Sequence, residues 1–260
     1  MSKFRPLIPF LFAAVTLAAC SSQPSQQTRA EMEAESARAF NQMRASMPLV
    51  TDRETIDFVA CVAQSVVEVL EPPFNDIEWE LAIFEEGAVN AFAMPGGKIG
   101  VFSGLLKVTE NQDQLATVIG HEVAHVLAHH SNERVSQQFA VEQSLGLISA
   151  LSSPQTETGR TMMGLLGVGA QYGILMPYNR VQESEADRLG LNLMARAGFN
   201  PAESIILWRN MSTAGGAQPP EFLSTHPSHS TRISGLSAIL PNAQRLQRTA
   251  QQQGKRPACK

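Results

Sequence analysis

The chain has 260 residues, of which 43% are hydrophobic and 17% are charged, and its formal net charge at pH 7 is −4. These values are typical of a globular protein with one moderately large core. Its 20 Lys and Arg residues are spread along the sequence without a dense basic block, which argues against nucleic-acid binding. Because the chain has only six His and three Cys, a metal site has to be predicted from the spacing of particular residues.

The first twenty residues have the pattern of an export signal. Two basic residues precede a mostly apolar run at residues 7–18, which is too short for a helix that crosses a hydrocarbon core of ~30 Å. The run ends in Leu-Ala-Ala-Cys at residues 17–20, which resembles a bacterial lipobox and implies cleavage after residue 19 and lipid on Cys20. Ser21 and Ser22 resemble an outer-membrane sorting signal. We therefore expect an outer-membrane lipoprotein that faces the periplasm and is anchored without a membrane span; the alternative is a secretory signal with an incidental cysteine.

The rest of the chain is predicted to be one domain between two polar segments. Residues 20–29 are polar and suit a flexible tether. The domain is expected at residues 30–241, and residues 242–260, rich in Gln and Arg, are expected to form a polar tail. Cys61 and Cys259 are an even pair in an oxidising compartment, so a disulfide between them is plausible. A buried thiol and a free thiol in a frayed tail fit the sequence nearly as well.

The apolar spacing in this domain predicts an α+β fold, mainly helical, with a small antiparallel sheet. Helical spacing recurs in its first part, and short apolar runs separated by turn residues follow. The expected helices are residues 30–47 and 52–70, and the expected strands are residues 79–84, 89–94 and 98–102, with a hairpin turn at Pro95-Gly96-Gly97.

Three later segments complete the prediction. Residues 112–130 are apolar on almost all sides of a helix, which indicates a central buried helix. Residues 162–176 are Gly-rich and apolar, and we expect them to pack against the domain or line a groove, with membrane contact as the alternative. Asn200 and Pro201 are typical of the start of a helix, and Glu203 is placed to complete a capping box.

His121, Glu122 and His125 form the pattern His-Glu-x-x-His inside the predicted buried helix. Residues four apart share one face of a helix, so both imidazoles can point at one metal ion with Glu122 beside it. The alternative is a structural histidine pair, but two imidazoles and a carboxylate in an apolar helix need polar partners. His129 and His130 lie farther along the same segment and are predicted to be structural.

An acidic pattern at residues 183–187 offers candidates for a third metal ligand. Catalytic zinc takes three protein ligands and keeps a fourth position for water, and two His with one Glu is an established set. Glu183 is the preferred candidate because Asp187 lies one turn beyond it, where a carboxylate can accept the spare N–H of a ligand histidine. The alternatives are Glu185 as the ligand, or a solvated acidic face. We therefore expect one Zn²⁺ per chain on His121, His125 and Glu183, although other divalent metals suit the same ligands.

Several blocks of the sequence are similar to the HtpX-like gluzincin zinc metallopeptidases, and the layout most resembles the periplasmic lipoprotein members of that family. The resemblance implies a zincin-like fold, with the sheet flanking the metal-binding helix, and in that family Glu-x-x-Ala-Asp supplies the third ligand, here Glu183. A metzincin would need a Gly and a third His farther along the helix, where Ala128 and Ser131 stand. The matching blocks are residues 90–99, 121–125, 183–188 and 224–227, together with Arg232.

This set of residues implies a mechanism. Zinc lowers the pKa of a bound water toward ~7 and polarises a carbonyl, and Glu122 takes the proton of the water and returns it to the leaving amine. His226 or Arg232 can donate to the developing oxyanion. In related proteins the His-Pro segment resembles a loop that caps the zinc, so His226 is alternatively an inhibitory fourth ligand, or part of a plain surface loop. The alternative for Arg232 is a salt bridge to an acidic partner such as Asp187.

The predicted hairpin suggests how substrates bind. Asn90, Ala91, Phe92 and Ala93 have the makings of an exposed strand edge to which an extended peptide can add; the alternative is that the hairpin only closes the core. Main-chain pairing reads conformation rather than sequence, so we expect a zinc-dependent endopeptidase acting on unfolded or misassembled envelope polypeptides. The competing function is a chaperone-like envelope lipoprotein with a latent or vestigial zinc site. Oligomeric state is not predicted.

Overall fold

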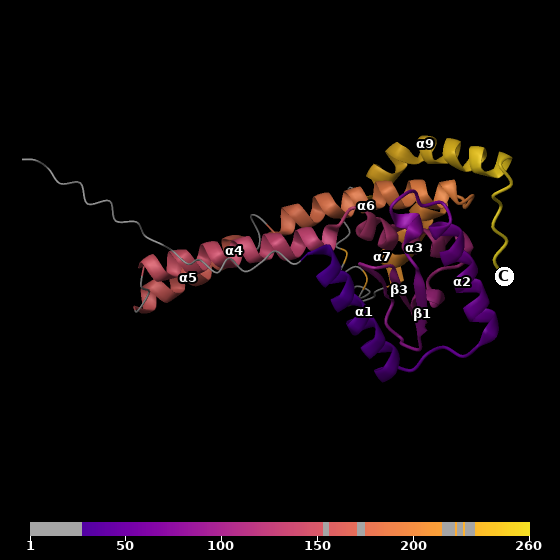
Figure 1. Ribbon diagram of the computed structural model, residues 1–260. Helices are drawn as coiled ribbons and strands as arrows, with labels where there is room; N and C mark the ends of the chain where they lie inside the picture. Colours follow the sequence, from indigo (N-terminus) through magenta and orange to yellow (C-terminus); the bar gives the residue numbers. More distant parts are fainter. Residues whose placement is uncertain (1–27, 153–155, 171–174, 215–221, 223–225, 227–231) are drawn as a thin grey trace, which may run out of the picture.

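The computed structural model of the chain describes residues 28–152, 156–170, 175–214, 222, 226 and 232–260. The predicted export signal, Cys20 and most of the expected tether lie outside the described residues. Among the helices that are described, none combines the length and the apolar character needed to cross a membrane. The chain forms a globular body from which a pair of helices projects to one side (Figure 1).

The body is mainly helical with one small sheet, which confirms the predicted α+β class. Two short 3-10 segments, η1 (Phe74–Asp76) and η2 (Leu105–Lys107), accompany the strands. The strands are β1 (Glu80–Phe84), β2 (Ala91–Met94) and β3 (Lys98–Phe102). The α-helices are α1 (Arg29–Ser46), α2 (Arg53–Val67), α3 (Gln112–Leu127), α4 (His130–Ser152), α5 (Glu157–Ala170), α6 (Met176–Arg196), α7 (Glu203–Ala214) and α9 (Arg232–Gln252).

The sequence predicted an antiparallel sheet, but the sheet is mixed. Its order is β1-β3-β2, with β2 antiparallel and β1 parallel to β3. The turn between β2 and β3 contains Gly96 and Gly97, whose φ angles of 79° and 75° glycine adopts without steric cost. This tight turn pairs β2 with β3 and leaves β1 the opposite side, where Leu81 faces Ile99 in parallel register. β2 is therefore an edge strand of the described sheet.

Helix α3 lies at the centre of the body and is held at its first turn by a neighbouring helix. Asn111 caps α3 by accepting from the N–H groups of Asp113 and Gln114. The side chains of Asn111 and Gln114 donate to the Glu203 carboxylate at 3.1 and 3.0 Å. The Asn200 N–H donates to Asp113 instead of to Glu203. The predicted capping box is therefore wrong, because Glu203 stabilises the start of α3 rather than that of its own helix.

Helices α3 and α6 cross with their backbones almost in contact. At the crossing lie Gly120 on α3 and Gly190 on α6. A Cβ atom on Gly190 would come within 2.7 Å of the backbone nitrogen of His121, and one on Gly120 within 2.9 Å of the Gly190 carbonyl oxygen. The two glycines thus allow a separation between the helices that a side chain would prevent.

The C-terminal segment is attached to the body rather than free. Helix α9 runs without a break through the expected boundary at residues 241 and 242, with Pro241 inside it. Beyond the helix, Cys259 forms a disulfide with Cys61 on α2. The Gln112 side chain donates to the Pro257 carbonyl and accepts from the Cys259 N–H. Of the two possibilities that the sequence left open for these cysteines, the structure contains the disulfide.

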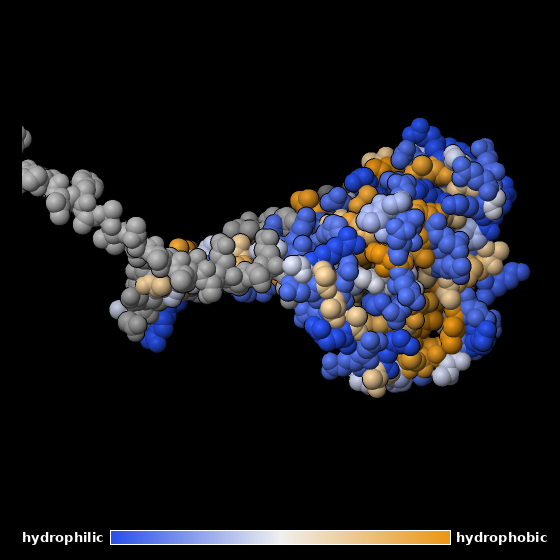
Figure 2. Space-filling view, viewed as in Figure 1, coloured by the Kyte–Doolittle hydropathy of each residue, from blue (hydrophilic) through white to orange (hydrophobic). Residues whose placement is uncertain are grey.

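Helices α4 and α5 form an arm that extends away from the body (Figure 1). Of the two possibilities expected for residues 162–176, packing against the body does not hold for the described part of α5, which packs on α4. The second possibility does hold, because Leu165, Leu166 and Ala170 line a groove together with α4. Leu165 on α5 and Leu147 on α4 are each 62% exposed. Figure 2 shows hydrophilic side chains and a band of hydrophobic ones on the visible face of the body. Among the described residues, the large hydrophobic side chains that are exposed lie mostly on the arm, at Val135, Leu147, Ile148, Leu165 and Leu166.

Candidate metal centre

Helix α3 brings the two histidines of the motif together, as its periodicity requires. His121 and His125 are one turn apart, and their Nε2 atoms lie 3.1 Å from each other. Both are buried within the body. Glu122 is also buried, at 3% exposure, and its Oε1 makes no hydrogen bond to any described residue. A carboxylate in this state is poised to accept a proton or a hydrogen bond from a group that enters the site.

Helix α6 completes the group with Glu183. Oε2 of Glu183 lies 3.2 Å from His121 Nε2, and Oε1 of Glu183 lies 3.4 Å from His125 Nε2. Glu183 is 1% exposed. The alternative ligand Glu185 has a side chain that is 45% exposed and lies near His130 instead. The geometry therefore favours Glu183, which is the residue that the sequence pattern had selected.

His226 is the fourth member of the cluster. Its Nδ1 lies 3.3 Å from His121 Nε2 and 3.2 Å from both carboxylate oxygens of Glu183. Its Nε2 lies 3.4 Å from Glu122 Oε1. One potential ligand atom from each of His121, His125, Glu183 and His226 lies within 4.8 Å of the other three, so this buried group can hold a metal ion. The donor set of imidazole nitrogens and a carboxylate suits zinc.

An arginine and an aspartate support the cluster from behind. Asp187 Oδ1 lies 3.0 Å from His121 Nδ1, the position expected for a carboxylate that fixes a ligand histidine. Arg232 donates to Asp187 at 2.6 Å and to Glu183 at 2.9 Å, and its guanidinium lies 4.0 Å over the Trp208 ring. The salt bridge that was the alternative for Arg232 is therefore present. Nη1 of the same guanidinium is buried and makes no hydrogen bond within the described part of the chain.

Two residues of α4 join the cluster, and the sequence did not reveal them as site residues. Arg134 donates to Glu183 at 3.0 Å and to the Gln182 side chain at 2.7 Å. His130 Nδ1 lies 2.8 Å from His125 Nδ1. Predicting either contact requires the path of the chain after α3, which no local motif indicates. For His130 the residue type was a signal, but its position suggested a structural role.

Burial and charge pull the ionisation of the cluster in opposite directions. Burial lowers the pKa of His121, but the hydrogen bonds that its ring donates to the Asp187 and Glu183 carboxylates, together with their negative charges, outweigh burial and raise this pKa to about 9. Burial and the neighbouring His121 charge lower the pKa of His125 far below its usual range. Burial alone would raise the pKa of Glu183, yet its hydrogen bonds with His121 and His226 hold this pKa well below the usual range. In the metal-free cluster the ionised Glu183 carboxylate is thus balanced by protonated His121 and by the guanidinium groups of Arg134 and Arg232, and a metal ion bound to His121 would have to displace its proton.

The edge strand and the segment containing His226 meet at one backbone contact. The Asn90 carbonyl accepts from Phe102 on β3, so strand alternation turns the backbone groups of Val89, Ala91 and Ala93 away from β3. The Val89 carbonyl accepts from the Phe222 N–H at 3.0 Å, and the Phe222 carbonyl accepts from the His226 N–H at 2.8 Å. The rings of Phe222 and His226 stack with centroids 4.6 Å apart.

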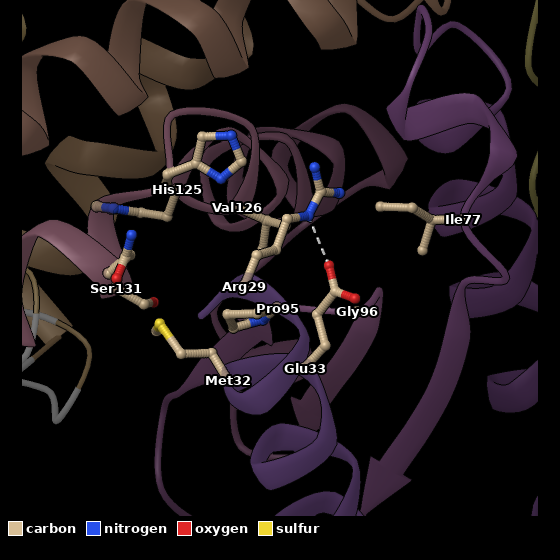
Figure 3. Close-up of a pocket in the computed structure, with 11 residues that line it drawn as sticks. Arg29, Met32, Glu33, Ile77, Pro95, Gly96, His125, Val126 and Ser131 are labelled. Atoms are coloured by element: carbon tan, nitrogen blue, oxygen red, sulfur yellow. Dashed lines mark hydrogen bonds and ion pairs between the residues drawn. The ribbon is translucent and has the colours of Figure 1, made fainter. Parts of the chain in front are cut away.

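A cavity lies at the other end of the edge strand. It has a volume of about 170 Å³, and its wall includes His125, Val126 and the turn residues Pro95 and Gly96. The start of α1 forms another part of its wall, where Arg29 pairs with Glu33 (Figure 3). The edge strand therefore runs from the Phe222 contact to a hollow that borders the metal-binding cluster.

A glutamate held between two histidines on a buried helix, with a second glutamate completing a metal-binding cluster, defines the class of His-Glu-x-x-His metallopeptidases. The chain belongs to peptidase family M48, because the sequence profile of that family matches residues 57–240. The expected resemblance is therefore confirmed at the level of the family.

Curated relatives from mitochondria and bacteria share this region. The chain is 35% identical over 189 residues to the mitochondrial metalloendopeptidase OMA1 of Schizosaccharomyces pombe, covering 72% of this chain and 53% of the relative. It is 38% identical over 181 residues to the protein of the same name from Saccharomyces cerevisiae, covering 66% and 50%. It is 29% identical over 204 residues to the beta-barrel assembly-enhancing protease of Escherichia coli, covering 74% and 40%. The chain thus spans about half the length of these relatives, or less.

Proposed function

We propose that the chain is a zinc-dependent endopeptidase in which His121, His125 and Glu183 hold the metal and Glu122 is the general base. The observation that carries this proposal is the buried group of ligand atoms within 4.8 Å of one another, with the buried Glu122 carboxylate beside it, whose Oε1 accepts no hydrogen bond from a described residue. A purely structural site would give no purpose to Glu122, because structural zinc sites close their coordination shell with protein ligands.

The roles of the residues follow from their positions. When bound, zinc supplies a Lewis acid that polarises a peptide carbonyl and lowers the pKa of water. Glu122 then accepts a proton from the attacking water and delivers it to the leaving amine. Asp187 holds His121 by its Nδ1, so that Nε2 remains available as a ligand. Arg232 holds both Glu183 and Asp187 in place and offers Nη1 as a further donor.

His226 makes the described conformation a resting one. Its Nδ1 lies among the ligand atoms and its Nε2 faces Glu122, so the imidazole occupies the space that a substrate carbonyl and the attacking water need. We place His226 as an inhibitory fourth ligand in this state. Displacing the segment that contains Phe222 and His226 would open the site.

The edge strand supports a role for unfolded polypeptides as substrates. The backbone groups of Ala91 and Ala93 face away from β3, so an extended peptide could add to β2 as a further strand. In the resting conformation Ala91 is 2% exposed and its N–H donates to the Asn90 side chain, so we propose that this edge becomes accessible only when the site opens. Such a peptide would pass the metal-binding cluster and reach the cavity at Pro95 and Gly96. Because the pairing is through the main chain, selection would depend on an accessible, extended conformation more than on side-chain identity.

The cellular setting that we propose is the bacterial envelope. The lipobox-like residues 17–20 support a lipoprotein anchored through Cys20 in the outer membrane and facing the periplasm. The name of the Escherichia coli relative, a beta-barrel assembly-enhancing protease, fits the same compartment. Misassembled or unfolded envelope proteins are accordingly the substrate class that we propose.

One observation favours a second function. His226 fills the fourth ligand position, and a permanently closed shell is the mark of a structural zinc site. If the segment never moves, the protein is instead a chaperone-like assembly factor with a latent site.

The test is degradation of casein, an unfolded protein, by the purified, zinc-loaded protein. The matched variants are Glu122→Gln, which removes the base, and Glu142→Gln, which changes a glutamate on the exposed side of α4. We expect cleavage by the wild type and by Glu142→Gln, and none by Glu122→Gln although it binds zinc. Absence of cleavage by all three, with zinc bound, would support the chaperone-like function.

A further inference from the structure

We propose that His130 is a positioning residue for the ligand His125, and that the break between α3 and α4 serves to place it. The proposal rests on the metal-binding role proposed for His125. It gives a function to His130, a buried histidine outside the ligand group. It also gives a function to His129, the non-glycine residue with a positive φ in the described part of the chain.

The contact between His125 and His130 cannot form in a continuous helix. Side chains five residues apart point about 140° away from each other around a helix axis. Here α3 ends at Leu127, and α4 begins again at His130. The redirected chain carries His130 back against α3, where the two Nδ1 atoms lie 2.8 Å apart and the ring centroids 4.9 Å apart.

His129 makes this break at a steric cost. Its φ of 56° lies in the left-handed region, where glycine is the usual residue at the end of a helix. The His129 ring contacts the Phe74 ring, with centroids 5.6 Å apart, a contact that glycine could not make. Strained backbone next to a site is informative because the surrounding structure has to maintain it.

The geometry fixes which nitrogen of His125 can bind a metal. His125 Nε2 points toward His121 and Glu183, and it can act as a ligand only if the proton of the ring is on Nδ1. That N–H then donates to Nδ1 of His130. The proton of His130 is in turn left on Nε2, which lies 3.5 Å from Glu185 Oε2.

Both ligand histidines therefore have a partner on the nitrogen that faces away from the metal. For His121 the partner is the Asp187 carboxylate; for His125 it is His130, with Glu185 beyond it. His130 is itself held, because its carbonyl accepts from Gln182 at 3.4 Å, and Gln182 also bonds to Arg134 and Glu133. Partners of this kind orient ligand histidines and typically change metal affinity by about 10- to 100-fold.

The test measures zinc affinity by competition with a chelating dye, so it does not depend on hydrolysis. The variants are His130→Phe, which fills similar space without an acceptor, and His130→Gln, whose amide oxygen can accept from the His125 N–H. We expect His130→Phe to bind zinc about 10- to 100-fold more weakly than the wild type, and His130→Gln to recover part of the loss. The d–d spectrum of the Co²⁺-loaded protein should change in His130→Phe and move back in His130→Gln.

Two controls separate positioning from folding. His129→Gly accommodates the φ of 56° and keeps His130 in place, so its zinc affinity should stay within about twofold of the wild type. Thermal unfolding of each metal-free variant shows whether the fold is intact. Equal zinc affinity in His130→Phe and the wild type, or no recovery in His130→Gln, would overturn the inference while leaving the proposed function in place. A wild type that binds no zinc would overturn both.

Discussion

Arg232 on α9 donates through Nε to Asp187 at 2.6 Å and through Nη2 to Glu183 at 2.9 Å. One side chain thus neutralises the proposed third ligand and the carboxylate that holds His121. The Arg232 side chain is 2% exposed and the Glu183 side chain 1% exposed, so these charges interact where water screens them little.

Replacing Arg232 with Leu should destabilise the metal-free protein by about 3–5 kcal/mol, because two buried carboxylates lose a partner. Arg53→Ala serves as the control, since the side chain of Arg53 is 87% exposed in its pair with Asp57 and such pairs contribute less than about 1 kcal/mol. The measurement is the free energy of unfolding in urea. A loss no larger than that of Arg53→Ala would mean that Glu183 and Asp187 find other partners.

His226→Ala separates the two roles considered for this residue, because they predict opposite signs. If His226 closes the resting site, its removal should raise the rate of casein cleavage on the order of tenfold, equivalent to about 1.4 kcal/mol. If His226 stabilises the oxyanion, the rate should fall by about 10²–10³. The cleavage rate, measured at equal zinc content, decides between them. We expect the rate to rise.

The crossing of α3 and α6 predicts an unusual sensitivity at Gly190. In Gly190→Ala the new Cβ would lie 2.7 Å from the His121 nitrogen, so the helices must separate, at a cost of about 1–3 kcal/mol. Gly146→Ala is the matched control, since Gly146 lies in α4 with nothing within 4 Å of a Cβ. It should stabilise the protein by up to about 1 kcal/mol. Equal effects of the two changes on the urea midpoint would contradict the close crossing.

Zinc affinity should depend on pH through His121. Without metal its pKa is raised to about 9 from an ordinary value of 6.5, so at pH 7 it carries a proton that zinc has to displace. The apparent affinity should therefore rise about tenfold per pH unit between pH 7 and 9. The same shift stabilises the metal-free protein fully below about pH 6.5, and this contribution is lost as pH rises through 9. Calorimetric titration in two buffers should detect release of one proton per zinc at pH 7; release of none would contradict this assignment.

Local periodicity was sufficient to predict half of the cluster. His121 and His125 share a face of α3 because the spacing of four residues determines it, and the same rule linked Glu183 to Asp187 on another helix. Assigning Glu183 to the same site as His121 and His125 depended on the usual ligand set of catalytic zinc, two His with one Glu, and the family resemblance agreed with it; no rule of spacing connects residues on these two helices. The Gly120–Gly190 contact explains the approach but is visible only in three dimensions.

The remaining features depend on where the chain turns. Arg134 and His130 enter the cluster because α3 and α4 are separate helices, whereas the apolar pattern of residues 112–130 suggested one continuous helix. Likewise, the tight turn at Gly96 and Gly97 pairs β2 with one side of β3, so β1 pairs with the other side, in parallel. The apolar pattern of a segment does not record where such a turn falls or which neighbours it brings together.

The hydrogen bond between the Val89 carbonyl and the Phe222 N–H has a consequence for selection by length. A polypeptide that pairs along β2 as far as Val89 competes with Phe222 for that carbonyl, and Phe222 holds the backbone of His226. Under the proposed function, a peptide that pairs along the whole of β2 would therefore also displace Phe222 and, with it, His226 from the metal site. A short peptide that pairs only with Ala91 and Ala93 would leave the hydrogen bond between Val89 and Phe222 intact and His226 in place. The resting protein would thus admit only substrates with an extended segment long enough to reach Val89, and it would select them before any peptide bond is cleaved.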